Sequence, residues 1–163
     1  MPEELSVDQI TAIISAFGKG AERARKWGFD AVQIHGAHGY LINQFLSPLT
    51  NRRTDRYGGS PENRGRFLFE VYARIRETVG PDYPVLIKLN AEDNLTGGLE
   101  LGDAVVVAKK LSEAGIDAIE VSAGTPASGR KSPVRMEIDS PEKEAYHLNP
   151  ARTIKEAVQC PVM

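Results

Sequence analysis

The sequence predicts an α/β fold, namely a partial (β/α)8 TIM barrel of about three to four βα units. Helix-like and strand-like apolar patterns alternate along the 163 residues, as expected for a parallel sheet with helical crossovers. Long loops follow the predicted strands, whereas the helix-to-strand turns are short, which is typical of a barrel whose functional loops share one face. A short segment also recurs, as WGFDAVQIH at 27–35 and AGIDAIEVS at 114–122.

The first predicted helix begins at Ser6 and ends at Gly28. Ser6 and Gln9 fit a capping box, and apolar residues then recur at helical spacing, with Phe17 and Trp27 expected in the core. The short apolar run at 29–35 predicts a strand buried on both faces.

The rest of the chain repeats this alternation. After a long polar loop over 36–60, Ser60 as N-cap and Pro61 at the first helical position open a helix that ends at Gly80. The remaining predicted elements are a strand over 85–89, a helix over 102–114, a strand over 116–122, a long loop over 123–148, a short helix opened by Asn149 and Pro150, and a strand stub at 161–163.

The length bears on the domain organisation. A complete barrel needs about 250 residues, so we expect residues 1–163 to form one partial-barrel domain of a longer protein.

Composition excludes several functional classes. Apolar residues make up 41% of the chain and charged residues 26%, with a net charge of −2, which gives no reason to expect nucleic-acid or membrane binding. The single cysteine, Cys160, is expected to be buried and favours a reducing compartment, so the expected location is the cytoplasm.

The strongest candidate site is HGAHGYL at 35–41, directly after the first predicted strand. His35, His38 and Tyr40 could hold an anionic or carbonyl oxygen by donated hydrogen bonds, and the phenol could also deliver a proton. From the spacing alone, a satisfied core histidine at 35 and a packing tyrosine at 40 are equally compatible. A zinc site is less favoured, because structural zinc needs four ligands.

The segments HGAHGYL, NQFLSP, NRRTDRYGGS and ENRGRF follow one another in order between residues 35 and 67. Together they resemble the signature of the Old Yellow Enzyme family, especially its NADH:flavin oxidoreductase and 2-enoate or dienoyl-CoA reductase branches. The resemblance extends more loosely over the whole chain and implies the central half of the barrel, with the first strand as the fourth of eight. It also implies FMN as cofactor and NADH or NADPH as reductant.

The resemblance implies roles for individual residues. His35 and His38 would bind the carbonyl, nitro or carboxylate oxygen of an activated alkene, and Tyr40 would protonate its α-carbon. Lys88 stands where most members have an arginine beside the flavin pyrimidine ring, and lysine lacks the arginine's bidentate fork. Ser122 ends the third strand, where a substrate-lining role and a plain turn are both open.

The remaining expectations concern FMN binding, alternative functions and ion pairs. The family's other flavin contacts come from segments that this sequence lacks, so weak or no FMN binding is expected. Two alternatives remain: a Schiff-base lyase built on Lys88, and a non-catalytic half-barrel that forms homo-oligomers through exposed sheet edges. Structural ion pairs, without a chemical role, are expected for Asp55, Arg56, Arg64 and Arg66.

Overall fold

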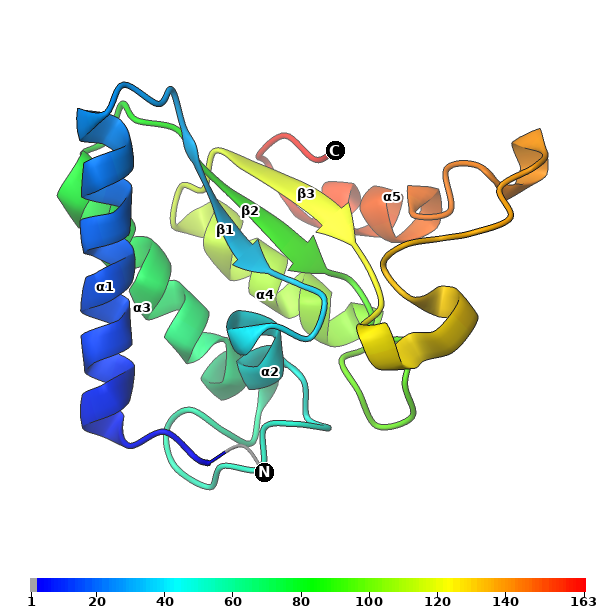
Figure 1. The fold of residues 1–163 in the computed structure, drawn as a ribbon, viewed down its shortest axis with the longest axis horizontal. Helices are drawn as coiled ribbons and strands as arrows, with labels where there is room; N and C mark the ends of the chain where they lie inside the picture. Colours follow the sequence, from blue (N-terminus) through cyan, green and yellow to red (C-terminus); the bar gives the residue numbers. More distant parts are fainter. Residues whose placement is uncertain (1–2) are drawn as a thin grey trace.

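The computed structural model describes residues 3–163 and contains a three-stranded parallel sheet in the order β1-β2-β3 (Figure 1). The strands are β1 (Val32–Gly36), β2 (Val85–Asn90) and β3 (Ala118–Ser122). Gly36 pairs with Leu89 and Asn90 pairs with Ser122, so the carboxyl ends of all three strands lie together. This arrangement agrees with the predicted partial barrel.

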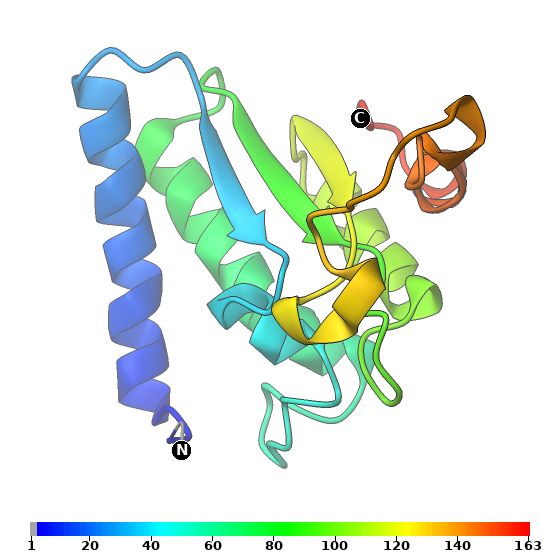
Figure 2. The same cartoon turned by 45° about the vertical axis from the view of Figure 1, so that its right-hand side comes forward.

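The helices α1 (Val7–Lys26), α3 (Pro61–Val79), α4 (Leu101–Glu113) and α5 (Leu148–Ala157) follow one another around one side of the sheet (Figure 2). Each is amphipathic and turns its apolar side toward the sheet or a neighbouring helix, which is how the layers of an α/β fold share a core. The core is built from Ile34, Ile87, Leu89 and Ile119 of the strands, with Phe67, Leu68, Val71, Ile75, Val107 and Leu111 of the helices.

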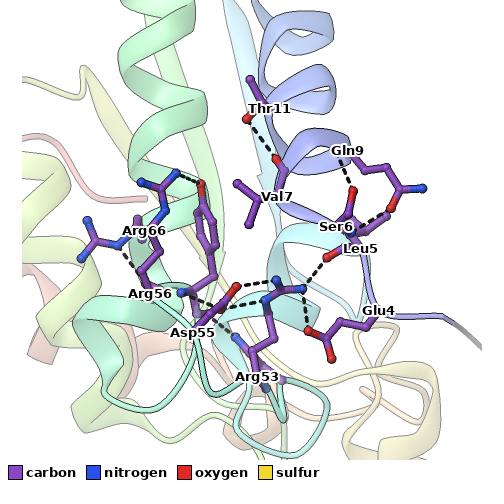
Figure 3. Close-up of polar contacts among 12 residues, drawn as sticks. Glu4, Leu5, Ser6, Val7, Gln9, Thr11, Arg53, Asp55, Arg56 and Arg66 are labelled. Carbon is purple, nitrogen blue, oxygen red and sulfur yellow. Dashed lines mark hydrogen bonds and ion pairs between the residues drawn. The ribbon is translucent and has the colours of Figure 1, made fainter.

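The start of α1 is fixed by its cap and by a distant loop (Figure 3). The predicted capping box is confirmed, because Ser6 Oγ accepts from Gln9 N at 3.2 Å and Ser6 N donates to Gln9 Oε1 at 2.8 Å. Arg53 donates to the Leu5 carbonyl at 2.7 Å and forms a bidentate pair with Asp55. The loop before α3 is thereby tied to the residue that precedes the N-cap of α1.

The two faces of the sheet differ in chemistry. Ile34, Ile87 and Ile119 are buried against the helices, whereas Gln33 and His35 of β1 are exposed on the opposite face. The expectation that this strand is buried on both faces was wrong for this chain, because its polar residues alternate with apolar ones.

Several element boundaries differ from those predicted. The expected polar loop over 36–60 contains a short helix, α2 (Leu41–Leu46), whose apolar side chains are buried under α3. The helix α5 begins earlier than predicted, with His147 rather than Asn149 as its N-cap. The loop after β3 also contains two 3₁₀ turns, Pro126–Lys131 and Pro141–Lys143.

The strand stub at 161–163 is confirmed as a parallel bridge between Val162 and Ile119 of β3. Cys160, just before it, is only partly buried, which corrects the expected burial. Trp27 is 70% exposed, so the prediction that it lies in the core was wrong. Phe17 is partly buried and packs against the core.

The expected structural ion pairs hold for two of four residues. Asp55 pairs with Arg53 and Arg64 pairs with Asp103. By contrast, the guanidinium of Arg56 donates to the Tyr57 hydroxyl, and that of Arg66 donates to a backbone carbonyl and to an asparagine side chain. Within residues 3–163, no helix is both long and apolar enough to span a bilayer.

Candidate functional site

The sequence-predicted residues His35, His38 and Tyr40 lie together at the carboxyl end of β1. The His35 and His38 rings are 5.2 Å apart between centroids and lie edge to face at 74°, and the Tyr40 ring is 5.1 Å from that of His35. Tyr40 is 61% exposed, so its phenol is accessible to a ligand. The geometry therefore brings two imidazoles and one phenol to a single open surface.

The turn that carries His38 has an unusual backbone. His38 has φ of 63° and Gly39 has φ of 77°, so two consecutive residues are left-handed. Glycine adopts this conformation freely, whereas a histidine there costs about 1–2 kcal/mol. Such a conformation persists only where surrounding contacts hold it.

The neighbouring strands contribute further polar groups to the same face. Lys88 stands beside His35 in the register of β1 and β2, and its Nζ lies 3.0 Å from Oε1 of Glu120 on β3. Gln33 Nε2 donates to the other oxygen of Glu120 at 2.7 Å. Sequence reasoning did not single out Gln33 or Glu120, although both occupy the same face at period-two spacing from His35 and Ser122.

Ser122 joins the histidines from the end of β3. Its hydroxyl lies 2.7 Å from His38 Nε2, and the residue is 9% exposed. The serine can donate to an unprotonated Nε2 or accept from a protonated one. Ser122 is the last residue of β3 rather than part of a turn, and its substrate-lining role stays a prediction.

The pKa values of His35 and His38 both lie below the ordinary value for histidine. Burial is the main cause for each, and the cation of Lys88 lowers both further. The proximity of His35 also lowers the pKa of His38, whereas Glu120 opposes these effects. Both imidazoles are therefore neutral at neutral pH, each with one N–H donor and one acceptor nitrogen.

The pKa of Glu120 lies below its ordinary value. Burial alone would raise it, but the hydrogen bonds from Lys88 and Gln33 outweigh that effect. The face thus carries one fixed positive and one fixed negative charge beside two neutral histidines.

Three buried polar residues are joined by hydrogen bonds beneath the His38 turn: Asn43 of α2, Asn90 of β2 and Asp93. We call them the polar cluster. The sequence analysis missed all three residues. The sequence did contain a signal for Asn90. This residue directly follows the predicted strand over 85–89, and the other two predicted strands also end in polar residues, His35 and Ser122. Among residues 3–163, no group of three or more His, Cys, Asp or Glu side chains could hold a metal ion.

Solved structures with this fold are similar along nearly the whole chain. A 2-naphthoyl-CoA reductase, solved with 2-naphthoyl-CoA, superposes with a TM-score of 0.86 at 34% identity, over 98% of this chain and 24% of that one. Morphinone reductase gives 0.75 at 30% identity over 99% and 40%. The Old Yellow Enzyme homologue of Zymomonas mobilis gives 0.76 at 28% identity over 98% and 42%. These likenesses confirm the Old Yellow Enzyme resemblance and the partial-barrel fold.

Sequence relatives agree with the structures. An NADPH dehydrogenase of Bacillus pumilus is 51% identical over 131 residues, which are 80% of this chain and 38% of that protein. An NADH oxidase of Thermoanaerobacter brockii is 43% identical over 162 residues, 99% of this chain and 24% of that protein. The chain thus spans between a quarter and two-fifths of these relatives. The model of the NADH:flavin oxidoreductase / NADH oxidase family matches residues 1–163, and the chain belongs to this family.

Proposed function

We propose that this chain provides the substrate-binding wall of an FMN-dependent NAD(P)H oxidoreductase that reduces activated alkenes. The observation that carries the proposal is the convergence of His35, His38 and Tyr40 on one open surface beside Lys88. The relatives named NADPH dehydrogenase and NADH oxidase support the oxidoreductase class and the nicotinamide reductant.

The two histidines bind the oxygen of the alkene's activating group. Because both are neutral, each offers one N–H without the desolvation cost of an imidazolium. Two donors directed at one oxygen stabilise the negative charge that develops there as the conjugated β-carbon accepts a hydride.

Tyr40 delivers the proton. Its phenol is exposed next to the His35 ring. The group that protonates the α-carbon of the alkene therefore lies beside the histidines that bind the oxygen of its activating group.

The donor set beside the histidines fits FMN. Among residues 3–163, Lys88 forms an ion pair with Glu120, and its side chain is 29% exposed, so further N–H groups of the ammonium are available. Lys88 would hold the carbonyl edge of the flavin ring. When bound, FMN supplies the hydride, and the protein supplies orientation and electrostatics.

The alternative of a Schiff-base lyase built on Lys88 gains no support from the geometry. The Nζ of Lys88 is engaged by the carboxylate of Glu120 at 3.0 Å, whereas a Schiff-base lysine needs a free amine to attack a carbonyl carbon.

The test is the consumption of NADPH by the chain with 2-cyclohexen-1-one in D2O, with the FMN concentration raised until the rate is constant, because weak FMN binding is expected of the isolated chain. We expect cyclohexanone carrying deuterium at the α-carbon. Tyr40→Phe should slow product formation about 10²-fold, because the phenolic proton donor is lost.

Tyr146→Phe is the matched control, because Tyr146 is also exposed but packs on His147 outside the cluster. It should leave the rate unchanged. Equal rates for wild type and Tyr40→Phe, or no alkene-dependent consumption by the wild-type chain, would contradict the proposal.

A further inference from the structure

A carboxylate, Asp93, is buried beneath the turn that carries His38. It is 2% exposed, and its partners are N–H donors rather than a cation: Asn43 Nδ2 and Asn90 Nδ2 at 3.0 Å each, and the backbone N of Leu99 at 2.9 Å. A buried carboxylate is costly unless hydrogen-bonded, so these three donors are needed to keep Asp93 in place.

The carboxylate sets the direction of the Asn43 side chain and, together with the Glu92 and Gly124 carbonyls, that of Asn90. An ionised carboxylate only accepts hydrogen bonds, so the NH2 groups of Asn43 and Asn90 must face Asp93. Their Oδ1 atoms consequently face away from Asp93, toward the loop after β1. A reversed amide would place an oxygen against the carboxylate and lose a hydrogen bond as well.

The Oδ1 atoms of Asn90 and Asn43 accept hydrogen bonds from two consecutive backbone amides. Asn90 Oδ1 accepts from His38 N at 3.2 Å, and Asn43 Oδ1 accepts from Gly39 N at 2.5 Å. These are the two residues with left-handed backbone. The captured amides stabilise a conformation that a histidine otherwise avoids.

The same cluster also reaches the end of β3. Asn90 Nδ2 donates to the Gly124 carbonyl at 3.0 Å, two residues beyond Ser122, whose hydroxyl contacts the His38 ring. The cluster therefore fixes both the backbone of His38 and the strand end that its imidazole contacts.

We propose that Asp93 is a positioning residue: through Asn43 and Asn90 it holds the left-handed turn that directs the His38 imidazole to the candidate site. The inference rests on the proposed function only in taking His38 as a group that binds the substrate oxygen. Asp93 is 2% exposed beneath the turn, and the role assigned to it is the orientation of Asn43 and Asn90.

The test uses the chain without flavin or substrate, so its outcome is separate from that of the activity assay. Asn43→Ala removes one amide without changing the charge, and Asp93→Asn removes the carboxylate. For both, we expect hydrogen exchange at the His38 and Gly39 amides to accelerate at least tenfold, with the amides of α3 unchanged. The His38 pKa, followed by NMR, should rise toward the ordinary value as its imidazole loses burial.

Asn51→Ala is the matched control. Asn51 also braces a loop, by donating to the Phe45 and Tyr57 carbonyls at 2.7 Å each, but it does not contact the His38 turn. It should leave both readouts unchanged. The proposal would be overturned if folded Asn43→Ala kept the wild-type amide exchange rates and His38 pKa. It would also be overturned if amide exchange accelerated uniformly throughout the chain, or if Asn51→Ala changed His38 in the same way. Should Asp93→Asn not fold, Asn43→Ala alone decides.

Discussion

At the scale of residues, the site combines two kinds of side chain. His35, His38 and Tyr40 present hydrogen-bonding groups at the surface, while Lys88 and Glu120 form an ion pair beside them. The pair leaves the face close to neutral, and the cation lowers the pKa of both histidines.

The influence of Lys88 can be measured directly. Lys88→Gln should raise the pKa of His35 and of His38, because it removes a nearby positive charge that disfavours the imidazolium. The imidazoles of the variant would then become protonated at higher pH than those of the wild type. An NMR titration of the ring resonances checks this.

Lys110→Gln provides the comparison, because Lys110 lies over the Phe69 ring on the helical side of the sheet. It should leave both titrations in place. A fall in the histidine pKa values of Lys88→Gln, or no change, would show that Lys88 does not influence the imidazoles as described.

At the scale of elements, much of the chain was predictable. Caps and apolar periodicity depend on residues close together in the chain. The sequence therefore predicted the Ser6 capping box, the Ser60 cap with Pro61, and the three strands. The short helix α2 was not, since a six-residue helix owes its stability to packing under α3 rather than to its own sequence.

The side chain of Arg64 on α3 connects α2, the loop before α3, and α4. Arg64 is 6% exposed; its guanidinium donates to the Leu46 carbonyl at 2.7 Å and also contacts the Gly59 carbonyl and Asp103 of α4. Arg64→Met should destabilise the chain by about 3 kcal/mol, because all three acceptors lose their partner in a largely buried place. Urea unfolding measures the loss.

Arg74→Met, on the same helix, is the comparison for that loss. The Arg74–Glu77 pair is exposed, with 42% and 70% of the side chains accessible, so the variant should change the free energy of unfolding by less than about 0.5 kcal/mol. Similar losses for the two variants would argue against a special role for Arg64.

At the scale of the whole molecule, the two edges of the sheet differ. The edge of β3 carries Val162 through a parallel bridge, whereas β1 is paired on one side only within residues 3–163. Beside β1, an apolar groove of about 400 Å³ is lined by Ile13, Phe17, Val32 and Ile34, among others. An unpaired strand next to apolar surface favours association.

We therefore expect the isolated chain to self-associate at high concentration. Light scattering should give a mass above the 17.8 kDa of one chain, rising with concentration. Phe17→Glu should shift it back toward the monomer, because it places a charge in the groove. Trp27→Glu, which alters an exposed aromatic residue outside the groove, should not. A monomer at every concentration would contradict this prediction.

The sequence by itself determined the alternation of helices and strands, the N-caps of α1 and α3, and the segment that carries His35, His38 and Tyr40. These properties depend on residues close together in the chain. Only the tertiary structure decided that Asp93 orients Asn43 and Asn90 beneath the His38 turn, and that Ser122 and Glu120 reach the same face. The physical reason is that a buried polar group takes whichever partner lies within hydrogen-bonding distance in space, and here those partners come from different strands and loops.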